Sequence, residues 1–275
     1  MNLSRYALSA LLLVTVGCNQ TQENAWDTYV SRLSSTLQVT PTKVEPLEFR
    51  IPPISVKEDI ETSSISLIEL WDIKHCELHQ TIANRNSNLG RLRVPSQEWV
   101  YTMNFIALAP NCIQSLSNDE VSMTLQDALE EKRRQLPTLA SNVVFASDEW
   151  RSFWQVMTFN ASHPTEGVLA FSQLVSNLIN LNTLSSEQLE SLLATIYHSN
   201  AGGTLLVELS NERRYLRVAI QTLRDVEQLQ YCPRGKAARQ LSGLIGGYYN
   251  TEVQSYSAET HRNWGTLIAA LEQLR

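Results

Sequence analysis

Residues 64–116 read SISLIELWDIKHCELHQTIANRNSNLGRLRVPSQEWVYTMNFIALAPNCIQSL, and this stretch decides how the chain folds. Apolar residues recur in it at helical spacing on both sides of residues 84–90, where asparagine and glycine supply the conformations that end helices. The second half begins at Pro95, which suits a first helical turn, and the helix is expected to stop at Pro110. The stretch therefore predicts two long helices that form an antiparallel hairpin.

Helix signals continue after the hairpin, whereas proline-rich sequence precedes it. Residues 39–62 hold four of the nine prolines, so this segment is expected to be an extended strap lying across the helices. Ser117 and Ser185 each begin a capping-box pattern, and Pro137 is expected to end the helix that follows Ser117. Ser147 is expected to cap a helix that holds Trp150, Phe153 and Trp154, and two final helices are expected over residues 238–255 and 257–274. No stretch shows the period-two alternation of a strand. The sequence predicts an all-α fold with about nine helices in a single globular domain, residues 24–275.

The first 18 residues predict export from the cytoplasm. Arg5 precedes an apolar run over residues 7–16, which has the length of a signal-peptide core. This run is shorter than the roughly 20 residues that span a bilayer. Residues 15–18, Thr-Val-Gly-Cys, resemble a bacterial lipobox, although Thr15 stands where leucine is usual. The alternative interpretation is an ordinary secretory signal followed by a chance cysteine.

The lipobox interpretation predicts where the protein is held. We expect residues 1–17 to be removed as a lipoprotein signal peptide and Cys18 to carry three acyl chains, with residues 18–23 forming a short tether. Asn19 follows the cysteine, and a residue other than aspartate there favours the outer membrane in such lipoproteins. The sequence therefore predicts a lipid-anchored protein on the periplasmic face of the outer membrane.

The composition narrows the range of partners. The chain has 22 Lys and Arg against 28 Asp and Glu, a formal net charge of −6 at pH 7. Nucleic-acid binding requires basic patches, so no nucleic-acid partner is expected. The sequence shows no nucleophile elbow, phosphate-binding loop or dinucleotide fingerprint, so we expect no cofactor and favour a non-catalytic protein.

The centre of the hairpin carries a family resemblance. Residues 82–91, IANRNSNLGR, together with residues 95–97, are similar to a segment of Gram-negative lipoproteins filed as domain of unknown function 3080. Asn84 stands where the family segment has glutamate, and the residues around Cys112 and Cys232 are similar as well. The resemblance covers nearly all of the mature chain. It implies a lipid anchor and a helical fold, and it carries no assigned activity.

Three cysteines would remain after lipidation, and an oxidising compartment predicts one disulfide and one thiol. In a hairpin of two straight helices, Cys112 would lie about 9 Å beyond the position level with Cys76. A disulfide needs Cα atoms within about 7 Å. We therefore expect Cys112 to pair with Cys232 and Cys76 to be a buried thiol. The alternative pairing, Cys76 with Cys112, requires Pro110 to fold the chain back.

Two groups of polar residues in the hairpin are candidate sites. His75 and His79 have the i, i+4 spacing of a helical metal site, but Cys76 would point about 100° away, so no metal is expected. Arg85, Asn86, Asn88 and Arg91 could hold an anion or the backbone of a partner. We favour the local interpretation, in which the two asparagines cap helices and Arg85 pairs with an interior acid or with carbonyls.

These features together predict a membrane-anchored, periplasm-facing lipoprotein. Its expected role is that of a non-catalytic helical binding or envelope-scaffold module, with another envelope protein as its partner. Two alternatives remain open. One is an enzyme acting on cell-wall or lipid material, which would require a deep cleft with a carboxylate or histidine of shifted pKa. The other is a binder of a small ligand near Arg85 and Arg91.

Overall fold

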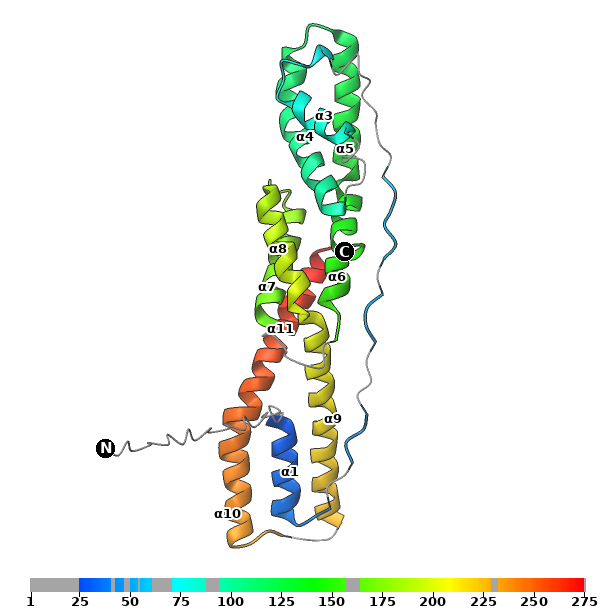
Figure 1. Ribbon diagram of the computed structural model, residues 1–275. Coiled ribbons are helices and arrows are strands. Elements are labelled where there is room, and N and C mark those ends of the chain that lie inside the picture. Colours follow the sequence, from blue (N-terminus) through cyan, green and yellow to red (C-terminus); the bar gives the residue numbers. More distant parts are fainter. Residues whose placement is uncertain are drawn as a thin grey trace, which may run out of the picture.

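The computed structural model shows an elongated stack of helices with three apolar cores along its length (Figure 1). The residues it describes are 25–40, 43–46, 50–53, 55–60, 71–87, 94–156, 164–228 and 232–274. These residues form helices and no β-strand, which confirms the all-α prediction. The signal peptide, Cys18 and the tether lie outside the described residues.

The upper section in Figure 1 contains the predicted hairpin. It packs α3 (Leu78–Asn86), α4 (Pro95–Ser115) and the first half of α5 (Asp119–Phe145) around one core. The largest fully buried side chains in this core are Ile73, Leu78, Ile82, Phe105 and Leu125. The prediction of a long first helix is wrong in its described part, because residues 73–77 form turns and α3 begins only at Leu78.

Two helices continue through prolines that were expected to end them. Helix α4 continues through Pro110, and α5 continues through Pro137. Buried side chains flank both prolines: Ala109, Cys112, Leu136 and Leu139. An interior proline costs a helix about 3 kcal/mol. Burying one of the larger apolar side chains stabilises the fold by about 1.5–3 kcal/mol, so burying several of them offsets the cost of the proline. Tertiary packing therefore overrides the local signal.

The middle section contains the largest core. It brings together α6 (Asp148–Phe153), α7 (Pro164–Ile179), α8 (Ser186–Ser199), the start of α9 (Ala201–Gln228) and the end of α11 (Gln254–Gln273). The capping box predicted at Ser185 is confirmed, because its hydroxyl accepts from Gln188 N while the Gln188 side chain accepts from Ser185 N. At the start of α5 the cap is Asn118 rather than the predicted Ser117.

The lower section packs α1 (Ala25–Leu37) against α9 and the C-terminal helices. There α10 (Lys236–Gly243) passes into a π-helical stretch (Leu244–Val253) and then into α11 without a break. The sequence predicted two separate helices over this region. None of the described helices is long and apolar enough to cross a membrane.

The predicted strap connects the lower section to the upper one. Its described residues between 39 and 60 are extended, and Figure 1 shows them running beside the stack from the end of α1 towards α5. The Asn142 side chain fixes the strap to α5, because its amide donates to Glu58 O at 2.9 Å and its oxygen accepts from Glu58 N at 2.9 Å. A further backbone bond joins Ser55 N to Phe145 O at 3.1 Å. The strap is therefore part of the fold.

Candidate functional site

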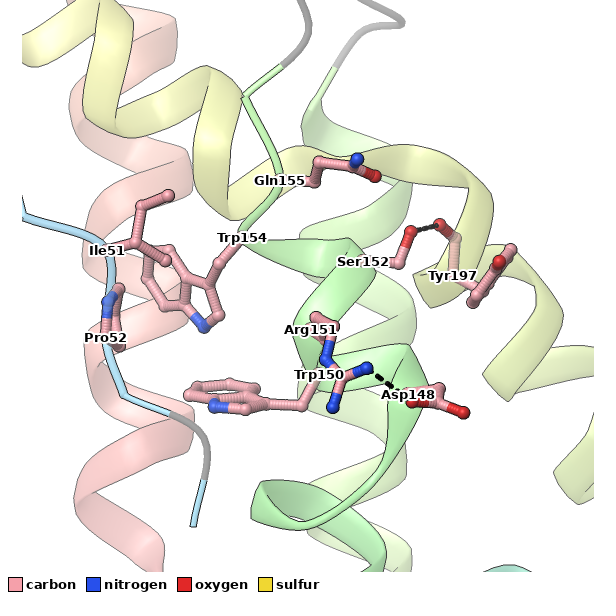
Figure 2. A pocket seen from close by; sticks show the side chains of 9 residues that line it. All are labelled: Ile51, Pro52, Asp148, Trp150, Arg151, Ser152, Trp154, Gln155 and Tyr197. Carbon is pink, nitrogen blue, oxygen red and sulfur yellow. Dashed lines mark hydrogen bonds and ion pairs between the residues drawn. The ribbon is translucent and has the colours of Figure 1, made fainter.

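A cavity of about 500 Å³ lies between the strap and α6. Figure 2 shows Ile51 and Pro52 of the strap on one side, with the indole rings of Trp150 and Trp154 turned towards them. The remaining lining residues are Asp148, Arg151, Ser152, Gln155 and Tyr197. The cavity therefore has an apolar side formed by the strap and the two tryptophans, and a polar side formed by the rest of α6 and by α8.

Local sequence explains how α6 presents its two tryptophans. Ser147 caps the helix, since its hydroxyl accepts from Trp150 N at 3.2 Å. Trp150 and Trp154 are four residues apart, which places both on one face of the helix. On the polar side, Arg151 pairs with Asp148 at 3.3 Å, and the Ser152 hydroxyl donates to Tyr197 O at 2.5 Å. The Ser152 bond therefore joins α6 to α8 on the polar side, while the exposed Arg151–Asp148 pair contributes little.

Aromatic packing makes the tryptophan side rigid. Trp150 stacks on Phe153 with an angle of 9° between the rings, and Phe153 stacks on Phe171 with ring centroids 5.3 Å apart. Trp150 and Trp154 contact each other edge to face at 5.3 Å. Aromatic pairs of this kind stabilise by about 0.5–1.5 kcal/mol each beyond area burial. The wall is therefore largely preformed.

The two indole N–H groups are the unusual feature of this wall. Trp150 and Trp154 are 4% and 3% exposed, and neither indole nitrogen has a hydrogen-bond partner within the described part of the chain. A buried donor without an acceptor costs about 1–3 kcal/mol. Each nitrogen exposes less than 1 Å² to solvent, so a ligand oxygen would accept from it, and recover this cost, after a small shift of the atoms that cover it. The arrangement suits an apolar molecule that carries a carbonyl or similar acceptor.

The predicted binding segment has a structural role at Arg85. Its Nε lies 3.1 Å from Glu98 Oε2, and both side chains are less than 20% exposed, at 19% and 15%. This ion pair joins α3 to α4, as the local interpretation predicted. Asn86 is exposed at the end of α3, while Asn88 and Arg91 lie outside the described residues.

A buried lysine beside this ion pair escaped the sequence prediction. Lys132 of α5 is 7% exposed, and its Nζ lies 4.6 Å from the ring centre of Tyr101 and 5.4 Å from that of Phe105. Burial lowers the pKa of Lys132, while Glu98 acts in the opposite direction. The cation–π contacts hold α5 to α4. Lys132 follows two glutamates in a polar run, EEKRRQ, so no local signal distinguished it from a surface lysine.

The predicted Cys112–Cys232 disulfide is wrong. Cys112 is bonded to Cys76 with Cα atoms 5.5 Å apart, and Cys232 is an exposed thiol. The prediction assumed two straight helices. Because residues 73–77 form turns, Cys76 is not fixed to a helical register and can approach Cys112 on α4.

The same turns separate the two histidines considered for metal binding. His75 is exposed in the turn, with its Nε2 3.3 Å from Ser115 Oγ, whereas His79 lies in the first turn of α3. They do not share one helix, so the i, i+4 geometry assumed for a metal site does not apply. Within the described residues, no group of three or more His, Cys, Asp and Glu side chains is placed to hold a metal ion.

The sequence signalled only part of the cavity. The cap at Ser147 and the aromatic spacing of Trp150, Phe153 and Trp154 predicted a helix with a large apolar face. They did not indicate that Ile51 and Pro52, about 100 residues earlier, would close over it. Contacts over such a separation leave no periodic signal in the sequence.

Comparison with known proteins places the chain in one family. The family model described as a protein of unknown function, DUF3080, matches residues 26–275. The match extends from α1 to the end of the chain and so includes all three helical sections. No curated protein and no solved structure gives a significant match.

Proposed function

The chain belongs to the DUF3080 family of proteins of unknown function, and we propose that it is a lipid-anchored helical binding module of the bacterial envelope. Cys18 would carry the acyl chains and hold the body on the periplasmic face of the outer membrane. The cavity between the strap and α6 would hold the ligand. The observation that carries the ligand-binding proposal is the cavity of about 500 Å³ between the strap and the two tryptophans, whose buried indole N–H groups find no acceptor among the described residues.

The disulfide supports the proposed location. Cys76 and Cys112 are bonded, and disulfides persist mainly in oxidising compartments such as the periplasm. This support does not depend on the lipobox at residues 15–18, because it comes from a different part of the chain. Intact-mass analysis of protein purified from membranes tests the anchor directly. Three acyl chains on Cys18 are expected, and a mature chain without lipid would overturn this part of the proposal.

The chemistry of the cavity defines the class of ligand. Its volume of about 500 Å³ falls within the 300–1,000 Å³ common for small-molecule sites. Ile51, Pro52 and the two indole rings favour an apolar body, and the indole N–H groups favour an oxygen acceptor. An acyl ester or amide of moderate size combines both properties. The envelope that surrounds a lipoprotein is rich in such molecules.

A single substitution separates the hydrogen bond from the apolar contact. Trp154→Phe keeps an aromatic ring and removes the N–H, so binding of a short-chain monoacylglycerol should weaken about threefold to tenfold, the value of one hydrogen bond. Trp71→Phe is the matched control, because Trp71 is 67% exposed in the upper section. Calorimetric titration measures both. Absence of binding to the wild type, or equal affinity in both variants, would contradict the proposal.

The ligand site lies at α6 rather than near Arg85 and Arg91 in this proposal. The Arg85 guanidinium is already paired with Glu98 and also lies over the Tyr101 ring at 5.6 Å. Binding an anion there would compete with the contact that joins α3 to α4. The alternative of an enzyme acting on cell-wall or lipid material stays a prediction of the sequence alone.

A further inference from the structure

The lower section exposes an apolar stripe on α9. Leu216, Ile220 and Leu223 are 39%, 48% and 51% exposed. At 3.6 residues per turn they lie within about 60° of one another around the helix. Val218 lies on the opposite side of α9, at least about 140° from each of them, and Val226 lies about 60° beyond Leu223; both are buried in the core shared with α1. In the part of the chain that the structure describes, the stripe faces away from the core.

Arginines flank this stripe on one side. Arg213, Arg217 and Arg224 are exposed, and their spacing places them between about 60° and 100° around the helix from Leu216. By the same spacing the exposed Glu227 lies in line with the stripe, one turn beyond Leu223, and ends the apolar surface there. Up to that point the surface is apolar along its centre and positive along one edge. This pattern is typical of helices that lie in the interface of a membrane.

The arginine edge contains a cavity suited to a phosphate. Arg213, Arg214 and Arg217 line a volume of about 380 Å³ together with Ser210 of α9 and Glu45 of the strap. Arg217 Nη1 lies 3.2 Å from Glu45 Oε2, and both side chains are more than half exposed, at 54% and 68%. Exposed ion pairs of this kind contribute less than about 1 kcal/mol. The singly charged phosphodiester of a phospholipid headgroup could therefore replace the Glu45 carboxylate at little cost.

The position of α1 brings this surface close to the proposed anchor. Six residues lie between Cys18 and Ala25, the first residue of α1, so the Cα atoms of Cys18 and Ala25 are at most about 25 Å apart. Helix α1 packs on α9, and Asp27 in its first turn interacts with Tyr215 of α9. An acylated Cys18 would thus hold the start of α1, and the part of α9 beside it, close to the bilayer.

We propose that the α9 stripe of Leu216, Ile220 and Leu223, with Arg213, Arg217 and Arg224 beside it, docks onto an anionic phospholipid surface. This inference rests on the lipid anchor proposed above. Lipid phosphates occupy the arginine cavity, and the apolar side chains enter the boundary between headgroups and acyl chains. Helix α9 lies roughly parallel to the long axis of the stack (Figure 1). Docking through α9 would therefore place the long axis of the body parallel to the membrane.

A polarity-sensitive dye at one position tests the docking. In the full chain, Cys232→Ser removes the exposed thiol, and Ile220→Cys supplies a new one for the dye. Met123→Cys is the matched control, because Met123 is also exposed, at 65%, but lies on α5 in the upper section. In vesicles containing phosphatidylglycerol, the dye at 220 should shift to the blue and be quenched by a lipid-borne quencher, while the dye at 123 stays in water.

Charge reversal tests the arginine edge. Each basic residue near an anionic surface contributes about fivefold to binding, so Arg213→Glu with Arg217→Glu should lower vesicle affinity by at least about 25-fold. Zwitterionic vesicles should give a similarly weak signal. A dye at 220 that stays in water on an acylated chain would overturn the inference. A blue shift without vesicles that grows with protein concentration would assign the stripe to a second copy, and would also overturn it.

The intact mass of the same samples separates the two proposals. A chain without acyl groups contradicts the anchor, and the dye then reports whether α9 enters the vesicle membrane without it. An acylated chain whose α9 stays in water leaves the anchor intact and refutes the docking surface. An acylated Cys18 offers no thiol to the dye, so labelling of one site per chain confirms both the anchor chemistry and the position of the probe.

Discussion

The disulfide between Cys76 and Cys112 provides a quantitative test of the fold. The bond closes a loop with a sequence separation of 36 residues, which contains α3 and most of α4. In the chain-entropy model, closing a loop of this length removes about 13 cal/mol/K from the unfolded state, or about 4 kcal/mol at 25 °C. Cys76→Ala should therefore lower the free energy of unfolding of the oxidised protein by up to about 4 kcal/mol.

Urea unfolding followed by circular dichroism measures this loss. With an m-value of about 3 kcal/mol per molar urea, the midpoint should fall by about 1.3 M. The upper section should be the first to unfold in the variant, because the bond joins its elements alone. Reducing the wild type should give a similar shift, since it opens the same loop.

Cys232→Ser is the control for this experiment. Cys232 is exposed and unbonded, so the variant should unfold at the wild-type midpoint. The reasoning would be refuted if Cys232→Ser lost as much stability as Cys76→Ala, or if a peptide map linked Cys112 to Cys232. A shift below about 0.2 M urea in Cys76→Ala would show that the loop is already ordered in the unfolded state.

Two further variants test packing and electrostatics. Gly203→Ala should destabilise the protein by about 1–3 kcal/mol, because a Cβ at this position would lie 2.3 Å from Gln155 O. Gly265→Ala should stabilise it by up to about 1 kcal/mol, because a Cβ there would meet no atom within 4 Å and alanine favours the helix. Thermal unfolding of both tests this, and equal effects would contradict it. Burial lowers the pKa of Lys132 in the folded protein below its ordinary value of 10.5. At a pH between the folded and unfolded pKa values, Lys132 is protonated in the unfolded chain but mostly neutral in the folded one. The free energy of unfolding therefore rises with pH in this range. Lys132→Met should remove that rise below pH 10.5 in urea unfolding, and an unchanged pH slope would count against the burial argument.

Local signals predicted the elements wherever one physical effect dominated. The caps at Ser147 and Ser185 form as expected, because each satisfies backbone N–H groups within the same turn. The prolines between residues 39 and 62 keep the strap extended. The prediction that Pro110 and Pro137 end their helices was wrong. The free-energy cost of a proline inside a helix is local, whereas the burial that offsets it depends on distant helices.

The candidate site was harder to predict than the fold. The sequence offered Arg85 an interior acid or carbonyls as partners, and the structure pairs it with Glu98. The cavity between the strap and α6 was missed, since it depends on Ile51 and Pro52 lying over Trp150 and Trp154. Neither segment contains a motif that identifies the other.

The sequence by itself determined the all-α class, the extended strap and most helix starts, because periodicity, caps and prolines act over a few residues. Only the tertiary structure decided the pairing of Cys76 with Cys112, the continuation of helices through two prolines, the burial of Lys132 and the cavity beside α6. Each of these depends on how distant segments pack. The free energy of that packing comes from contacts between residues far apart in the chain, which no local pattern encodes.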